Sequence, residues 1–203
     1  MIIVVDYGMG NLRSVEKAFS FLGHEVAVSG DPEEVAAAAG VVLPGVGSFG
    51  DAMKELRRRR LLACVEEAVR GGRPFLGICL GYQLLCEESE ESPGVSGLGV
   101  LPGRVLRFPP SVKVPHMGWN DVRATRDHPV LAGVEDGSFF YFVHSFYVVP
   151  ERREDVLTTT EYGPTFASGA AFGKVVAFQF HPEKSSQAGL RILDNFARWC
   201  TGG

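Results

Sequence analysis

The chain has 203 residues, of which 45% are hydrophobic and 22% charged, and its formal net charge is −4 at pH 7. This composition excludes disordered and collagen-like proteins, and the length suits one domain with a well-buried core. The acidic balance argues against a dedicated nucleic-acid binder, whose affinity depends on neutralising phosphates. No apolar run reaches membrane-spanning length, and the first residues lack the basic start and cleavage site of a secretion signal. We therefore expect a single domain, residues 1–203, in a cytoplasmic enzyme.

The first half of the chain alternates strand-like and helix-like segments. In chain order these are the strand Ile2–Asp6, the helix Leu12–Leu22, the strand Glu25–Ser29, a short helix beginning near Asp31, the strand Val41–Leu43, helical runs through residues 50–70 and the strand Pro74–Ile78. Gly23 suits the end of the first helix, and Asp31 followed by Pro32 suits the start of the second. This order predicts an α/β fold with a doubly wound, mostly parallel sheet and helices on both faces.

From about Leu98 the pattern changes to short strand-like segments between turn signals. They are Val105–Phe108, Lys113–His116, Phe139–Val143, Val156–Thr160, Ala170–Phe172 and Val175–Phe180. We expect them to form antiparallel additions to the sheet in the second half of the chain. A last helix is predicted over about Ser186–Cys200. The acidic stretch Glu87–Glu91 is interpreted as a solvated loop.

The four cysteines form neither a CxxC pair nor a Cys/His cluster with zinc spacing, so we expect no metal site. Cys64, Cys86 and Cys200 each lie in an apolar, helix-like run, where a free cysteine behaves as a small hydrophobic residue. Cys79 has different neighbours, because it lies between two glycines.

The segment Gly77-Ile78-Cys79-Leu80-Gly81 follows a buried strand and precedes a helix-like segment, Tyr82–Cys86. This arrangement is typical of the nucleophile elbow of hydrolases, with sulfur in place of oxygen. At a helix N-terminus the dipole and the free N–H groups favour thiolate over thiol. The carboxyl end of a strand is also where ligands bind in open α/β sheets. The alternative interpretation is a buried cysteine in a glycine-rich turn.

A thiol nucleophile needs a base, and the base needs a group that orients it. His181-Pro182-Glu183 offers one of each, because residues two apart in an extended chain project to the same side. Pro182 keeps His181 out of the helical conformation. The motif is weak alone, but together with the elbow it predicts a catalytic triad of Cys79, His181 and Glu183. The remaining histidines are expected to face solvent, as at His24 and His128, or to be structural, as at His116 and His144.

Gly45-Val46-Gly47-Ser48-Phe49-Gly50 matches the GxGxxG fingerprint of dinucleotide-binding enzymes. However, it follows the third strand and not the first, Pro44 precedes it, and no acidic residue ends a second strand about 20 residues further on. We therefore expect no nucleotide and no other cofactor. The loop can instead present backbone N–H donors to a tetrahedral oxyanion, with Leu80 as a second donor.

With these residues assembled, the sequence resembles the class I (triad-type) glutamine amidotransferases over essentially the whole chain. The segments Gly77–Gln83 and His181-Pro182-Glu183 are shared by this family. Pro44-Gly45-Val46-Gly47 and His116-Met117-Gly118-Trp119-Asn120 are similar to one branch of it, which acts in histidine biosynthesis. Glutaminases of vitamin B6 or aminodeoxychorismate synthesis have different glycine loops.

The resemblance implies that the chain hydrolyses L-glutamine to glutamate and ammonia through a thioester on Cys79. The N–H groups of Val46 and Leu80 would hold the oxyanion. The residues that would contact glutamine are Gly45, Gly47, Gln83, Ser145 and Phe146.

The resemblance also implies a heterodimer with a (β/α)₈-barrel cyclase, which uses the ammonia to form imidazole glycerol phosphate and AICAR. The positions that would face this partner are Asn11, Trp119, Tyr141 and Lys184. Neither a nucleic acid nor a membrane is expected as a partner.

Two alternatives remain open. The chain could be the glutaminase subunit of another amidotransferase. It could also be a non-catalytic, thiol-sensing protein on the same scaffold, which would keep Cys79 without needing His181 and Glu183. The basic run Arg57–Arg60 could suggest a phosphate or RNA site, but its amphipathic helical setting in an acidic protein favours a solvated face.

Overall fold

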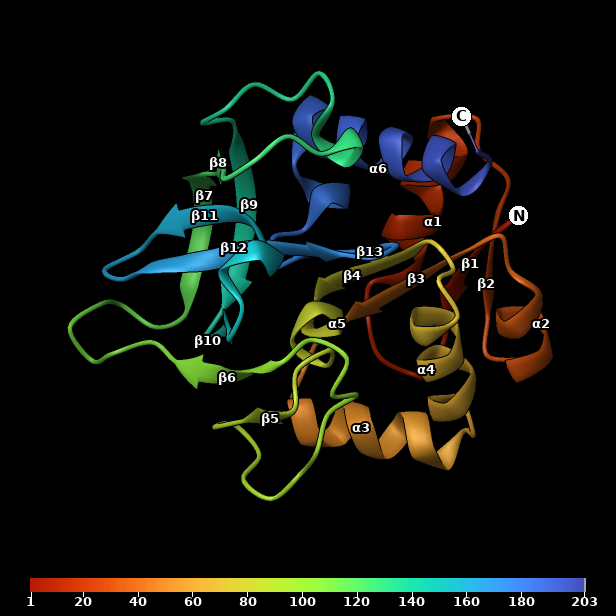
Figure 1. The fold of residues 1–203 in the computed structure, drawn as a ribbon, viewed down its shortest axis with the longest axis horizontal. Coiled ribbons are helices and arrows are strands. Elements are labelled where there is room, and N and C mark those ends of the chain that lie inside the picture. Colours follow the sequence, from red (N-terminus) through yellow and green to blue (C-terminus); the bar gives the residue numbers. More distant parts are fainter. Residues whose placement is uncertain (203) are drawn as a thin grey trace.

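The computed structural model describes residues 1–202, and its centre is a sheet of eight strands (Figure 1). The strand order is β2-β1-β3-β4-β13-β12-β11-β8. The parallel strands are β2 Val26–Ser29, β1 Ile2–Val5, β3 Gly40–Gly45, β4 Phe75–Cys79 and β13 Val175–Phe178. The antiparallel ones are β12 Thr165–Phe172, β11 Val156–Glu161 and β8 Arg123–Ala124. The predicted doubly wound α/β sheet with antiparallel additions is confirmed. The segment expected among the antiparallel additions at Val175–Phe180 instead runs parallel to β4, as β13, and ends at Phe178.

Helices cover both faces of this sheet (Figure 1). One face carries α1 Leu12–Phe21 and α6 Ser186–Cys200, and the other carries α2 Pro32–Ala37, α3 Phe49–Arg58 and α4 Leu62–Arg70. Neighbouring residues of β1 therefore enter different cores: Ile3 packs with α3 and α4, whereas Val4 packs with α1 and α6. Strands that are buried on both faces need continuous apolar runs, and this is why the sequence pattern identified them.

Two smaller sheets lie outside the main one, and here the sequence prediction is partly wrong. One sheet contains β10 Phe146–Pro150, β6 Gly103–Arg107 and β5 Glu88–Ser89, and the other contains β7 His116–Asp121 and β9 Phe139–His144. The segments predicted at Val105–Phe108 and Phe139–Val143 are therefore strands, but they do not extend the main sheet. The strand predicted over Lys113–His116 instead begins at His116, because Pro115 has no N–H to donate to a ladder.

The acidic stretch Glu87–Glu91 is not simply a solvated loop. Glu88 and Ser89 form β5, which pairs with β6, and the side chain of Ser89 is buried. The Glu91 carboxylate accepts a hydrogen bond of 2.7 Å from the backbone N–H of Phe49, the first residue of α3. A carboxylate is favourable there because it faces the positive end of the helix dipole.

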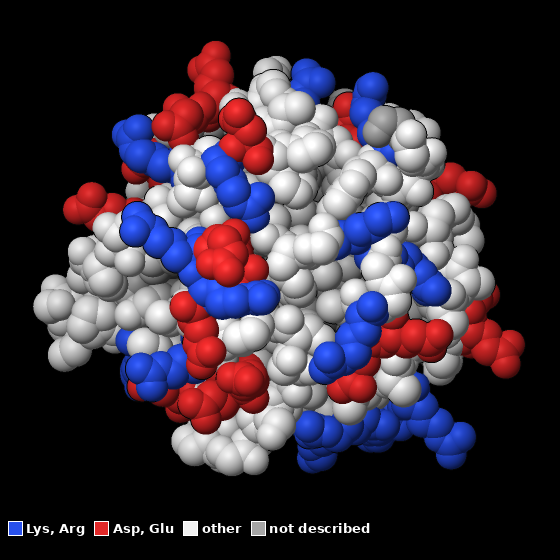
Figure 2. Space-filling view, viewed as in Figure 1, with Lys and Arg blue, Asp and Glu red and all other residues white. Residues whose placement is uncertain are grey.

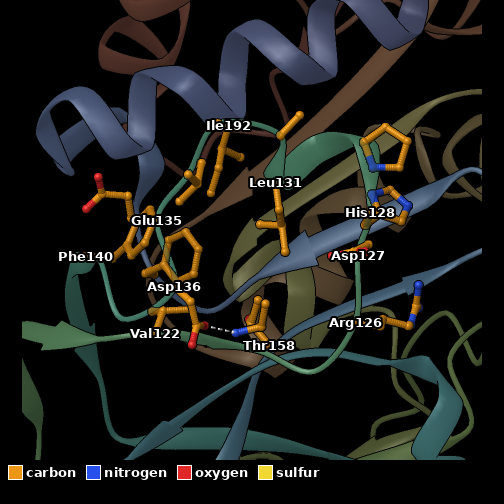
Figure 3. A pocket seen from close by; sticks show the side chains of 16 residues that line it. Val122, Arg126, Asp127, His128, Leu131, Glu135, Asp136, Phe140, Thr158 and Ile192 are labelled. Atoms are coloured by element: carbon orange, nitrogen blue, oxygen red, sulfur yellow. Dashed lines mark hydrogen bonds between the residues drawn. The ribbon is translucent and has the colours of Figure 1, made fainter.

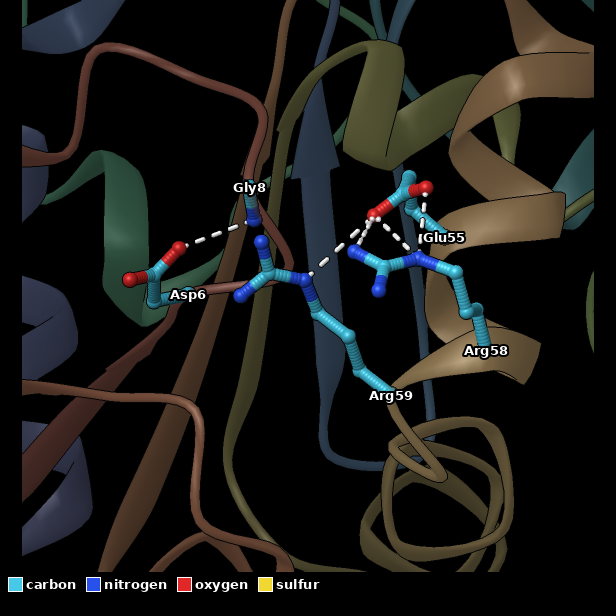
Figure 4. A network of polar contacts seen from close by, with 5 residues as sticks. All are labelled: Asp6, Gly8, Glu55, Arg58 and Arg59. Carbon is cyan, nitrogen blue, oxygen red and sulfur yellow. Dashed lines mark hydrogen bonds and ion pairs between the residues drawn. The ribbon is translucent and has the colours of Figure 1, made fainter.

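The basic run Arg57–Arg60 lies on a largely exposed segment, as expected. Arg58 and Arg59 both pair with Glu55, at 2.7 and 3.4 Å, beside the loop that holds Asp6 and Gly8 (Figure 4). Acidic and basic side chains are interspersed over much of the face shown in Figure 2. Within residues 1–202, no helix has both the length and the apolar character needed to cross a membrane.

Gly81 lies at the closest contact between α5 Leu80–Gln83 and the sheet. A Cβ atom at this position would overlap the carbonyl oxygen of Leu43 on β3. We predict that Gly81→Ala lowers the free energy of unfolding by about 3 kcal/mol or more, measured by urea denaturation, because backbone cannot move aside as a side chain can.

Gly72→Ala is the control for this prediction. Gly72 has a φ of +70° but no atom within 4 Å of the added Cβ, so only the backbone strain of about 1–2 kcal/mol applies. Equal losses in the two variants would contradict a role for crowding at Gly81.

Candidate active site

Cys79 occupies a strained turn between β4 and α5. Its φ of 55° and ψ of −108° lie outside the regions that residues with a Cβ normally adopt, and α5 begins at the next residue, Leu80. Such strain costs about 1–3 kcal/mol and persists only where the surroundings impose it. The structure therefore shows the strand–turn–helix geometry that the glycine spacing predicts, although the helix begins earlier than the predicted Tyr82.

The register of the sheet brings other segments to Cys79. β4 lies between β3 and β13, and Gly45 of β3 is the register partner of Cys79. Phe178, the last residue of β13, is the partner of Ile78. Consequently the glycine loop after β3 and the His-Pro-Glu segment after β13 both leave the sheet at the carboxyl edge, where Cys79 lies.

His181 and Glu183 meet as the sequence predicts, although Pro182–Lys184 form a 3₁₀ helix and not the expected extended chain. His181 Nδ1 lies 2.9 Å from Glu183 Oε1, and the two side chains are only 3% and 1% exposed. The backbone of His181 is fixed on both sides, because its N–H donates to Tyr141 O and its carbonyl accepts from Ser185 Oγ. Glu183 therefore holds the ring with Nε2 free for another partner.

The thiol of Cys79 is close enough to affect the imidazole of His181. Burial lowers the pKa of His181, but the contacts with Cys79 and Glu183 outweigh burial and raise this pKa above its ordinary value. Nε2 nevertheless makes no hydrogen bond of ordinary length and angle. The sulfur thus influences the ring although no hydrogen bond joins it to Nε2 within the described part of the chain.

The thiol has two further polar neighbours. The Cys79 Sγ atom lies 4.0 Å from Val143 O and accepts a weak contact of 3.7 Å from Gln179 Nε2. Gln179 is completely buried. Sequence reasoning did not identify Gln179, because a glutamine in an apolar strand end carries no signal of its own.

The glycine loop runs along the nucleophile. Gly45 ends β3, Val46 is 43% exposed, and Gly47 has a φ of +95°, which favours glycine. Ser48 then caps α3 by accepting from the N–H of Asp51. Val46 and Leu80, the two residues expected to supply oxyanion donors, both line the cavity that contains Cys79.

A cavity of about 320 Å³ opens over Cys79. Its lining includes most of the residues that the sequence analysis assigned to the site: Val46, Gly47, Cys79, Leu80, Gln83, Ser145, Phe146 and His181. Gly45 and Glu183 are not in the lining, because Gly45 lies in the sheet and Glu183 lies behind the imidazole. The volume suits a molecule of amino-acid size.

Glu91 is a cavity residue that sequence reasoning missed. It is the only carboxylate among the described residues that line this cavity. In the sequence, nothing distinguishes Glu91 from the other acidic residues of this stretch. Its side chain points toward the cavity because its carboxylate bonds the backbone N–H of Phe49, which is distant in the chain. The carboxylate could accept from an ammonium group of a ligand.

His116 and His144 are buried next to each other, in agreement with the structural role expected for them. Burial lowers the pKa of His116 to about 4. Burial also lowers the pKa of His144 to about 3; the carbonyl of Phe146 opposes this shift, and the neighbouring His116 and His181 add to it. Both rings are therefore neutral at pH 7.

The lowered pKa values of these two histidines predict how the free energy of unfolding depends on pH. In the unfolded chain a histidine titrates near about pH 6.5, so below that pH the unfolded state binds more protons than the folded state. The free energy of unfolding should then fall with falling pH, by up to about 1.4 kcal/mol per pH unit for each histidine. His116→Phe should flatten this slope between about pH 6 and about pH 4.5 in urea denaturation. If the free energy of unfolding of His116→Phe depends on pH as steeply as that of the unmodified protein, the pKa of His116 is not lowered in the folded state.

Three of the residues expected to face a partner lie together. Trp119 on β7 is the register partner of Tyr141 on β9, and their rings are 6.2 Å apart. The ammonium group of Lys184 lies 5.9 Å from the Tyr141 ring. Trp119 is 51% exposed, and Met117 and Phe139 beside it are also exposed. Asn11 lies immediately before α1, the helix that contacts the segment Pro182–Lys184.

A second cavity, of about 560 Å³, lies between α6 and the segment 126–136 (Figure 3). Its floor contains Leu131, Phe140 and Ile192, and acidic side chains such as Glu135 and Asp136 stand at its edge. It contains none of the site residues expected from the sequence, and no cysteine lines it. Its larger volume therefore does not make it the candidate active site.

Comparisons with known proteins agree with this assignment. The model of the family "Glutamine amidotransferase class-I" matches residues 3–199. The chain is 53% identical to the imidazole glycerol phosphate synthase subunit HisH of Moorella thermoacetica, covering 96% of this chain and 93% of that protein. It is 51% identical to the subunit of the same name from Aquifex aeolicus, over 97% and 95% of the two chains.

Solved structures show the same fold. A chain of PurLQS from Thermotoga maritima aligns with a TM-score of 0.78 at 21% identity, over 98% of this chain and 97% of that one. A crystal structure of a glutamine amidotransferase aligns with a TM-score of 0.74 at 23% identity, over 100% of both chains. The protein belongs to the class I glutamine amidotransferases.

Proposed function

We propose that this chain is the glutaminase subunit of an imidazole glycerol phosphate synthase and that Cys79, His181 and Glu183 are its catalytic residues. The observation that carries the proposal is that a strained cysteine and a histidine line one cavity of amino-acid size, while a carboxylate behind the histidine is bonded to it. The similarity to HisH subunits over almost the full length supports the choice of this synthase over another amidotransferase.

In the first half of the reaction, the sulfur of Cys79 attacks the carboxamide carbon of glutamine. Negative charge develops on the carboxamide oxygen, and the N–H groups of Val46 and Leu80 stabilise it. The protonated imidazole of His181 then donates its proton to the leaving nitrogen, which departs as ammonia. The products of this half are ammonia and a glutamyl thioester on Cys79.

In the second half, water hydrolyses the thioester. Neutral His181 takes a proton from the water, and the resulting hydroxide adds to the thioester carbon. The carbon–sulfur bond breaks, glutamate leaves, and the sulfur and the imidazole recover their starting states. Glu183 acts throughout by fixing the imidazole and by stabilising its positive charge.

The cavity offers complementary groups for glutamine. Gln83 and the segment with Ser145 and Phe146 line one part of it, and the Glu91 carboxylate suits the α-ammonium group. Gly45 and Gly47 allow the backbone of the loop to lie close to the substrate.

The partner in this proposal is a cyclase with a (β/α)₈-barrel fold. The exposed Trp119, the partly exposed Tyr141 and the nearby Lys184 supply a surface for it, and Asn11 is a further proposed contact. Delivery through a closed path is chemically reasonable, because ammonia released into neutral water becomes protonated and loses its nucleophilicity. The lack of a hydrogen bond from His181 Nε2 to Cys79 is consistent with low activity in the isolated subunit.

Removal of the nucleophile tests the proposal directly. We expect Cys79→Ala to reduce glutamine hydrolysis by at least about 10³-fold, measured as ammonia release with the cyclase and its nucleotide ligand present. The unmodified protein should release ammonia much faster with the cyclase than alone. Cys64→Ala, which removes a thiol from α4 far from the cavity, should keep full activity. Undiminished turnover in Cys79→Ala would overturn the proposal.

Replacement of the base separates an enzyme from a thiol sensor. His181→Asn should lower turnover of the thioester by about 10²–10⁴-fold, since it removes the proton donor and acceptor. Glu183→Gln keeps the shape of the side chain but removes the negative charge that stabilises the imidazolium, so it should lower kcat. The exposed Glu151→Gln should not. Normal thiol oxidation together with normal ammonia release in His181→Asn would contradict the catalytic assignment.

A further inference from the structure

We infer that His116 and Asn120 are positioning residues for glutamine, acting through a hydrogen-bonded relay that runs from β7 to the side chain of Gln83. Neither residue lines the cavity over Cys79. The inference rests on the proposed function, because it concerns the site at which glutamine would bind.

The relay begins at Asn120, whose amide orientation is fixed. Asn120 Oδ1 accepts from the backbone N–H of Asp121 at 2.9 Å, so Nδ2 is the atom that points the other way. Nδ2 donates one hydrogen to the carbonyl of Glu161 at 2.9 Å and the other to Nε2 of His116 at 3.2 Å. Nε2 of His116 is therefore an acceptor.

The two histidines continue the relay with one consistent proton arrangement. Phe146 O can only accept, so Nδ1 of His144, which lies 2.7 Å away, must carry a proton. Because the His144 ring is neutral, its Nε2 is an acceptor. Nε2 then receives the Nδ1–H of His116 at 2.9 Å. Each ring thus has its proton on Nδ1, in agreement with the direction fixed independently by Asn120.

The far end of the relay reaches the cavity. The carbonyl of Phe146 that accepts from His144 also accepts from Gln83 Nε2 at 3.0 Å. The second hydrogen of Gln83 Nε2 goes to Oε1 of Gln179 at 3.0 Å, and Gln179 Nε2 in turn contacts the sulfur of Cys79. Both donors of Gln83 are thereby used within the protein, which leaves its Oε1 as the group available to a ligand.

Aromatic neighbours hold His116 in this orientation. Its ring stacks on Tyr162 at 3.9 Å and on Phe142 at 4.8 Å between centroids. A planar, neutral ring is favourable there, and a charged ring would be poorly solvated among these side chains. A phenyl ring could keep the stacking while removing both polar atoms.

The relay and the exposed aromatic surface are on opposite sides of one strand. In β7 the side chains alternate, so Met117 and Trp119 are exposed while His116 is buried and Asn120 points back to it. A change in the position of β7 would therefore alter the hydrogen bonds that orient Gln83. His116 and Asn120 therefore lie between the proposed partner surface and the substrate cavity.

The test compares two reagents that label Cys79. A diazoketone analogue of glutamine needs the glutamine contacts, whereas iodoacetamide needs only an accessible thiol. In His116→Phe we expect the rate constant for the analogue to fall by about tenfold, as for the loss of one hydrogen bond, and that for iodoacetamide to change little. KM for glutamine should rise more than kcat falls when the cyclase is present. His116→Asn, which restores a donor near the Nδ1 position, should recover part of the labelling.

Asn120→Asp provides a second variant of nearly unchanged shape. A carboxylate cannot donate to His116, so it favours a proton on Nε2 of that ring and leaves two lone pairs facing each other between the histidines. The rate constant for the glutamine analogue, divided by that for iodoacetamide, should fall as in His116→Phe. If His116→Phe does not fold, Asn120→Asp alone tests the inference. An unchanged ratio in a folded variant, or an equal loss with both reagents, would overturn the inference. An unmodified protein that reacts with iodoacetamide but not with the analogue would instead overturn the proposed function.

Discussion

The backbone turn at Cys79 is the constraint on which the rest of the site depends. A left-handed φ at a residue with a Cβ is unfavourable, and the fold maintains it by placing β4 between β3 and β13 and by packing α5 directly against β3. The absence of a side chain at Gly81 permits this close contact. Because the turn ends a central parallel strand, the sulfur is presented at the sheet edge where the neighbouring loops converge.

The base is held from a different direction. His181 follows β13, but its backbone is hydrogen-bonded to Tyr141 of β9 and to Ser185 before α6. The small β7–β9 sheet is thus joined to the base by the backbone edge of β9, and it presents Trp119 and Met117 on an exposed face. The same small sheet therefore connects the proposed partner surface, the base and the substrate cavity.

Three buried histidines lie close together in two different electrostatic environments. His181 faces a carboxylate and a thiol, and these contacts raise its pKa in spite of burial. His116 and His144 face each other and neutral hydrogen-bonding groups, so burial dominates and lowers the pKa of both. Ionisable neighbours thus distinguish His181, whose pKa is raised in spite of burial, from two histidines whose rings stay neutral and serve as fixed dipoles.

The sequence by itself determined the α/β alternation, the strand–cysteine–helix turn, the pairing of His181 with Glu183 and the family. These features are local: apolar runs specify strands buried on both faces, and glycine spacing specifies the turn. The two-residue interval keeps the imidazole of His181 close to the carboxylate of Glu183, although residues 182–184 form a 3₁₀ helix and not the expected extended chain. Only the tertiary structure decided the two small sheets, the inward direction of Glu91 and the relay through His116. Each of these depends on partners distant in the chain, since Glu91 meets Phe49, His116 meets His144 and Gln83 meets Gln179. The spacing of apolar residues along the sequence does not predict such pairs, because hydrogen bonds between distant groups form only after the sheet has brought them together.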